Sequence, residues 1–147
     1  MSELNVAALD HTVQETNLWL KAVAKQLHFK ERHHAYSALR AVLHALRDRL
    51  TPDSAVHLGA QLPLLIRGIY YEGWHLAGKP TRDHDAQEFA DHVLQQLPPK
   101  FPMDPLTVSH GVFEVLWQRL DAGETAKVID QLPLPLRSLW PSIARAS

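Results

Sequence analysis

The stretch Gln61-Leu62-Pro63-Leu64 recurs 70 residues further along the chain as Gln131-Leu132-Pro133-Leu134. When this offset is kept without a gap, nine of the 29 pairs between 42–70 and 112–140 are identical. Unrelated segments of average composition would share about two. Because a fixed period marks a repeated structural unit, this match indicates an internal duplication.

The same register continues toward the N-terminus, where Gln26-Leu27 aligns with Gln96-Leu97. We therefore expect a single domain over 1–147 with a first repeat at 12–75 and a second at 82–145. Residues 76–80, which include Gly78 and Pro80, would join them. Each half would cover the open apolar face of the other.

Both repeats carry helical periodicity, and no stretch alternates as a half-buried strand does. A capping box of Thr12 with Glu15 predicts a first helix that ends near His28. A second helix is expected over 32–49. The residues expected to face inward from these two helices are Val13, Leu20, Val23 and Leu27, then Tyr36, Leu39, Leu43, Leu46 and Leu50.

Further helix starts are predicted at Thr51-Pro52, at Asp104-Pro105 and at Asp121, since these are N-cap residues, two of them followed by proline. Pro63 and Pro133 should break or kink the helices in which they fall. A short apolar helix after Pro63 would pack Leu65, Ile66, Ile69 and Tyr70 together and end at Gly73. The predicted fold is all-α: a duplicated helical bundle of two ~70-residue repeats, with three to four helices each and a pseudo-twofold relation.

The cysteine content and net charge of the chain exclude several classes of protein. The 147 residues include ten histidines, no cysteine and a formal charge of −1. The missing cysteine excludes disulfides and thiolate metal sites and favours a cytoplasmic location. Near-neutral charge argues against nucleic acid, and no apolar window is long enough to cross a membrane. Since the sequence also has no nucleotide-binding or nucleophile motif, we expect no cofactor and lean against an enzyme.

Several stretches carry a family resemblance: residues 38–50 (ALRAVLHALRDRL), 57–63 (HLGAQLP), 67–74 (RGIYYEGW), 88–89 (EF), 131–133 (QLP) and 136–141 (LRSLWP). Together they resemble the bacterial family known as domain of unknown function 2267. The resemblance implies a small, all-helical, duplicated cytoplasmic protein. It implies no activity and no catalytic residues, so candidate sites must come from the residues themselves.

Histidine spacing indicates one candidate metal site, formed by His84, Glu88, Asp91 and His92 on one side of a helix. His84 and His92 lie about 12 Å apart along the helix axis, so another helix would have to contribute a ligand. The alternative is a solvated polar face. The adjacent His33 and His34 should point about 100° apart and are predicted to form an exposed turn. His44 aligns with Glu114 and is predicted at the surface.

Arginines shared by the two repeats indicate a candidate anion site, since a guanidinium binds phosphate or carboxylate through paired hydrogen bonds. They are Arg49 with Arg119 and Arg67 with Arg137. The alternative is that these arginines bind the C-terminal carbonyl groups of helices.

Aromatic residues near the repeat ends, Tyr71, Trp74 and Trp140, are candidates for binding a protein partner or for closing the bundle. The leading hypothesis is a non-catalytic module for protein–protein interaction or scaffolding, with a protein partner or self-association. Binding of a metal or a small anion is the alternative.

Overall fold

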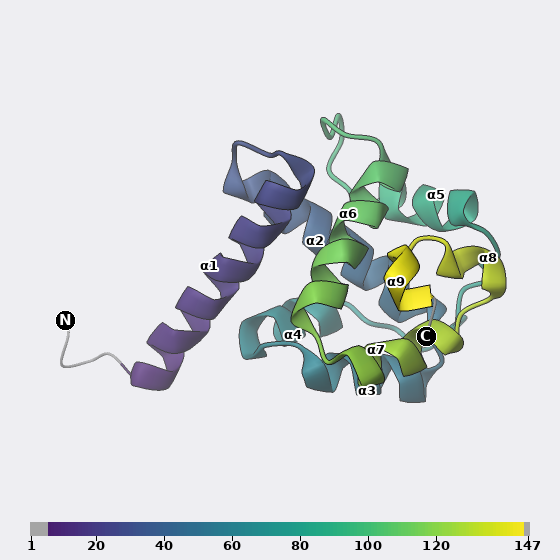
Figure 1. Cartoon of the computed structure of the whole chain (residues 1–147), viewed down its shortest axis with the longest axis horizontal. Helices are drawn as coiled ribbons and strands as arrows, with labels where there is room; N and C mark the ends of the chain where they lie inside the picture. The colour runs from purple at the N-terminus through teal and green to yellow at the C-terminus, as the bar shows by residue number, and fades with distance from the viewer. Residues whose placement is uncertain (1–5, 146–147) are drawn as a thin grey trace.

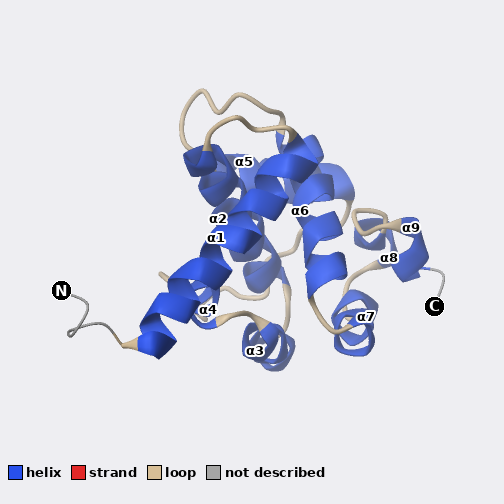
Figure 2. Cartoon of the chain, turned by 60° about the vertical axis from the view of Figure 1, so that its left-hand side comes forward, coloured by secondary structure: helices blue, strands red, loops and turns tan. Residues whose placement is uncertain are grey.

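The computed structural model describes residues 6–145, and every regular element in that range is a helix (Figure 2). The expected all-α class is therefore confirmed. The helices are α1 (Ala7–Leu27), α2 (Arg32–Arg49), α3 (Pro52–Gln61), α4 (Leu64–Tyr71), α5 (Ala86–Gln96), α6 (Pro105–Arg119), α7 (Ala122–Asp130), α8 (Leu134–Arg137) and α9 (Ser142–Arg145).

Helix α2 lies at the centre of the molecule and packs against α1, α4, α5 and α6. Residues 41–48 of this helix are buried without interruption. Leu39, Leu43 and Leu46 are fully buried as predicted, and Phe113 and Leu116 of α6 complete the middle of the core. A helix enclosed by four others must satisfy the polar groups of its buried segment inside the protein.

Local signals set most helix ends as expected. Thr51, Asp104 and Asp121 each accept a hydrogen bond from the backbone N–H three residues later, which caps α3, α6 and α7. At Asp104, hydrogen bonds from the Thr107 hydroxyl and from the Thr107 backbone N–H hold the pKa of the carboxyl below its ordinary value. The proline predictions are also confirmed, because α3 stops at Gln61 and α4 restarts directly after Pro63.

Helix α1 is longer than predicted. It begins at Ala7 rather than Thr12, and Thr12 lies inside it. The first turns of α1 are exposed and project from the body of the molecule (Figure 1). The rest of the helix packs on α2, α6 and α4. Val13 is consequently exposed rather than inward-facing, and Tyr36 and Leu65 are also more exposed than expected.

The connection from α4 to α5, residues 72–85, contains the predicted linker 76–80. Gly73 follows the end of α4 with a φ of +70°, a conformation in which glycine has no Cβ penalty. The Lys79–Pro80 peptide bond is cis. This connection runs back across α2, where the buried polar side chains lie.

Candidate functional site

The buried segment of α2 carries three polar side chains, His44, Arg47 and Asp48, each 5% exposed or less. Arg47 links α2 to the end of α4 through hydrogen bonds of its buried side chain. Its Nε donates to Asp48 Oδ1 at 2.9 Å, and its Nη1 donates at 2.8 Å to the carbonyl oxygens of Tyr70 and Glu72 at the end of α4. The guanidinium thus satisfies helix-terminal carbonyls that would otherwise lack a partner.

Asp48 extends this network toward α5. Its second carboxylate oxygen lies 3.7 Å from His92 Nε2, and His92 Nδ1 lies 3.1 Å from Asp83 Oδ2. The backbone carbonyl of Asp48 accepts from the N–H of Thr81 at 2.8 Å. Arg49 also binds this connection, because its Nε donates to the Asp83 carbonyl at 2.6 Å. The network therefore fixes residues 81–83 between α2 and α5.

His44 is the residue that the sequence interpretation misplaced. It is 2% exposed rather than on the surface, and its Nε2 lies 2.7 Å from the carbonyl oxygen of Ile69. Because a carbonyl only accepts, Nε2 carries the proton. Burial lowers the pKa of His44, while the Ile69 hydrogen bond opposes this effect. Alignment with Glu114 was misleading, since Glu114 is only partly buried on a different helix.

A polar recess of about 280 Å³ opens beside this cluster. Its lining comes from α2, from the connection after α4 and from Gln96 of α5. Arg40 and Glu72 form an ion pair of 3.0 Å at its rim, and Lys79 and His75 contribute further polar groups. The recess is thus lined by charged groups of both signs.

The four predicted metal ligands near α5 make separate contacts. Glu88 Oε1 accepts from the His84 backbone N–H at 3.2 Å, Asp91 accepts from Gln87 at 2.9 Å, and His92 faces Asp83 and Asp48. Glu88, Asp91 and His92 line one shallow hollow, which does not include His84. A metal at these residues stays a prediction, and it would have to displace these contacts.

Each of the four candidate anion-binding arginines contacts a different set of residues. Arg67 donates to the carbonyls of Gly59, Ala60 and Leu62, and Arg137 donates to those of Asp130 and Leu132. These contacts match the alternative of binding helix-end carbonyls. Arg119 lines a groove with Lys21 and Lys25 of α1, whereas Arg49 binds Asp83. An anion site shared by the four stays a prediction.

Among the candidate partner-binding aromatics, Trp140 is 1% exposed, and its ring stacks on Phe113 with centroids 4.4 Å apart. The ring fills the core, which matches the alternative that Trp140 closes the bundle, and a partner-binding role for it stays a prediction. Tyr71 and Trp74 are half-buried and lie against each other, with centroids 5.7 Å apart. The Tyr71 ring also covers Gly59 so closely that an added Cβ would collide with it.

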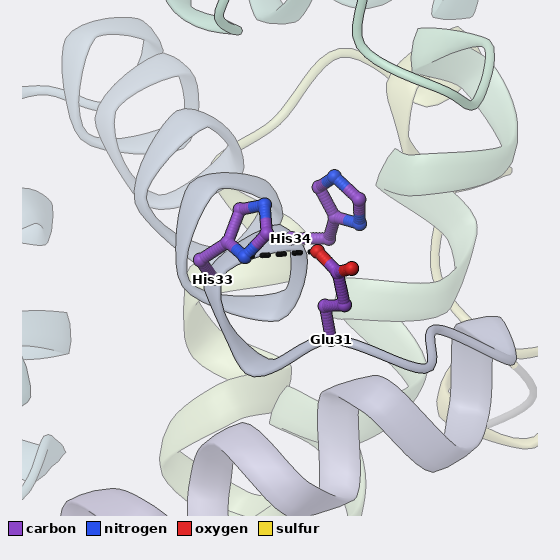
Figure 3. Close-up of side chains that lie close together, drawn as sticks. All are labelled: Glu31, His33 and His34. Carbon is purple, nitrogen blue, oxygen red and sulfur yellow. Dashed lines mark ion pairs between the residues drawn. The ribbon is translucent and has the colours of Figure 1, made fainter.

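A different cluster converges at the start of α2. Glu31, His33 and His34 each offer a ligand atom, and these atoms lie within 4.8 Å of one another. Figure 3 shows the three side chains gathered at the first turn, with His33 Nδ1 3.2 Å from Glu31 Oε2. In the part of the chain that the structure describes, no other set of three such groups converges. The rings of His33 and His34 lie 4.2 Å apart, contrary to the predicted divergence.

These observations define an all-helical protein with a buried polar network and an exposed histidine–carboxylate cluster. Within residues 6–145, no helix is both long and apolar enough to cross a membrane. A family model described as "Uncharacterized conserved protein (DUF2267)" matches residues 16–139, and the chain belongs to this family. A search of curated proteins found no match.

Proposed function

We propose that the chain is a non-catalytic interaction module that pairs with a second copy of itself through the N-terminal half of α1. One observation carries this proposal. Within α1, the side chains at positions 9, 13, 16, 20, 23 and 27 follow the alternating three- and four-residue spacing of a coiled-coil seam. Thr16, Val23 and Leu27 of this seam are buried, whereas Leu9 and Val13 are 58% and 54% exposed. Val6, the N-cap residue that precedes α1, is also exposed.

The exposed part of the seam is continuous with an interface that the protein already uses. Val23 and Leu27 hold α1 against α2 and α6, and both are nearly inaccessible to solvent. The same helix face continues toward the N-terminus, where Figure 1 shows the first turns of α1 projecting from the body of the molecule. An apolar helix face of this kind is typical of a docking element for another helix.

A second copy suits this face because the seam can pair with itself in the antiparallel direction. In that arrangement Leu9 packs against Val13 of the partner subunit, and the twofold axis repeats the contact. Antiparallel pairing also places the two bodies at opposite ends of the helix pair, so they do not collide. The buried surface is small, which corresponds to a weak, transient dimer.

The proposal is tested by sedimentation velocity from about 10 μM to about 1 mM protein, a range that populates weak dimers. We expect concentration-dependent dimerisation in the wild type. Leu9→Asp should raise the dimer Kd by about tenfold or more, because it places a charge in the middle of the seam.

Leu18→Asp is the matched control. Leu18 is 55% exposed on the same helix but on the opposite face, so its replacement should leave the dimer Kd unchanged. Circular dichroism verifies that both variants stay helical. A wild type that is monomeric throughout the concentration range, or equal effects of the two substitutions, would overturn the proposal.

We also propose that the chain is duplicated. The duplication is supported by the recurrence of helix boundaries at the 70-residue offset: α2 and α6 end at Arg49 and Arg119, and α4 and α8 begin at Leu64 and Leu134. Arg67 and Arg137 also bind equivalent carbonyls, since Ala60 and Leu62 correspond to Asp130 and Leu132. The cytoplasmic location expected from the cysteine-free sequence belongs to the same proposal.

A further inference from the structure

We infer that Glu31, His33 and His34 form a surface site for a divalent transition-metal ion. Two imidazoles and one carboxylate are a ligand set that suits zinc, nickel, copper or cobalt, and they suit calcium and magnesium poorly. The ligand atoms already lie within 4.8 Å of one another. This site is separate from the projecting half of α1 and from the predicted site near α5.

One distance between ligand atoms already matches the spacing around a bound ion. With metal–ligand bonds of about 2.0 to 2.2 Å, neighbouring ligand atoms around one ion lie about 3.0 to 3.5 Å apart. His33 Nδ1 and Glu31 Oε2 are 3.2 Å apart, within this range. Both side chains are more than 60% exposed, so small rotations bring the remaining atoms together without disturbing the core.

His34 gives the cluster a fixed ligand. Its half-buried ring contacts Phe29 and Phe101, with both centroid distances 5.6 Å. The two phenylalanines also contact each other edge to face at 5.7 Å. Packing of this kind restricts the rotation of the imidazole, so less conformational entropy is lost when an ion binds.

Glu31 supplies the negative charge that the site needs. It is the N-cap residue of α2, but its side chain makes no capping hydrogen bond. The polar N-cap residues of α3, α5, α6 and α7 each make one, whereas the apolar N-caps of α1, α4 and α8 do not. The positive end of a helix dipole opposes a cation, and the negative charge of the Glu31 carboxylate beside His33 offsets this unfavourable position. Three protein ligands leave coordination positions open to water or to an added ligand.

The inference is tested by titrating the untagged protein with Co²⁺, followed by its visible absorption, and with Zn²⁺ by calorimetry. We expect one ion per chain. Glu31→Gln and His33→Ala each remove an exposed ligand and should raise the Zn²⁺ Kd by about tenfold or more. Because both residues are exposed, the variants should remain folded, as the melting temperature verifies.

Two control variants test whether Zn²⁺ binds at this cluster rather than at another histidine. His28→Ala removes another exposed histidine, three residues before Glu31 in the chain, and should leave the Zn²⁺ Kd unchanged. His92→Ala removes a ligand of the site predicted near α5 and should also leave it unchanged. The inference is wrong if the wild type binds no Zn²⁺ or if the affinity of His33→Ala equals that of the wild type. It is also wrong if His92→Ala alone abolishes binding. None of these results depends on dimerisation, which sedimentation measures separately.

Discussion

His44 shows how much the surroundings of one side chain determine its chemistry. The chain has nine other histidines. His44 lies in α2 and is covered by the end of α4 and by the connection that follows α4. Its Nε2–H is bonded to the Ile69 carbonyl, and burial lowers its pKa. Arg40 and Arg47 also disfavour its protonation, whereas Asp48 favours it. The folded protein therefore favours the neutral form of this imidazole.

This lowered pKa predicts a pH-dependent stability. Below about pH 6.5 the unfolded chain protonates His44 and the folded protein does so only at lower pH, so the free energy of unfolding falls as pH falls. His44→Gln keeps an N–H donor and should remove this contribution, at a cost of about 1–3 kcal/mol at neutral pH. Urea unfolding at several pH values measures both effects.

His57→Gln is the control for His44→Gln, because His57 is exposed. Its free energy of unfolding should stay within about 0.5 kcal/mol of the wild type at neutral pH, and its pH profile should follow that of the wild type. If His44→Gln retains the full fall in stability between neutral and mildly acidic pH, other groups are responsible for it.

At the scale of elements, the crossing of α1 and α6 depends on a glycine. A Cβ on Gly111 of α6 would collide with the side chain of Leu27, which is 4% exposed at the end of α1. The missing side chain lets the two helices approach closely. Together with the packing of α1 on α2, this approach anchors the helix while its first turns project into solvent.

Gly111→Ala should therefore destabilise the protein. Overpacking costs about 1–3 kcal/mol, and this cost exceeds the gain in helix propensity of up to about 1 kcal/mol. Gly68→Ala is the matched control in α4, where no atom lies within 4 Å of the added Cβ. That variant should be stabilised by up to about 1 kcal/mol. Thermal and urea unfolding of both variants check the opposite signs, and a stabilised Gly111→Ala would contradict close packing at this crossing.

At the scale of the whole molecule, one buried ion pair joins elements that are distant in sequence. Arg47 and Asp48 are linked to the end of α4, to Thr81 and to His92 of α5. Such a pair is costly to bury, and breaking it leaves a charge without its partner. The network therefore couples the first half of the chain to the start of the second.

Asp48→Asn should lower the free energy of unfolding by about 3–5 kcal/mol, because Arg47 stays buried without a counter-ion. Glu72→Gln is the comparison, since Arg40 and Glu72 form a pair of similar length, 3.0 Å against 2.9 Å, with Glu72 60% exposed. That exposed pair is expected to contribute about 0–1 kcal/mol. Equal losses in the two variants, measured by urea unfolding, would mean that burial does not govern this network.

The positions of most helix ends were predictable from local sequence. A cap such as Asp104 bonds an N–H only three residues away, and Pro63 acts on the turn that contains it. Family membership was recognisable for a similar reason, because it depends on the residues themselves. The start of α1 was the exception: the Thr12–Glu15 pattern occurs inside a helix that the preceding residues already extend.

The sequence by itself therefore determined the helical class, most helix boundaries and the family of this protein. The tertiary structure alone decided that His44 is buried, that Trp140 fills the core, and that Glu31, His33 and His34 converge. Caps and prolines act within about one turn of chain, so residue order is sufficient to locate them. Burial and the meeting of side chains depend on which helices pack together and on the rotamers that packing permits, and neither follows from local periodicity.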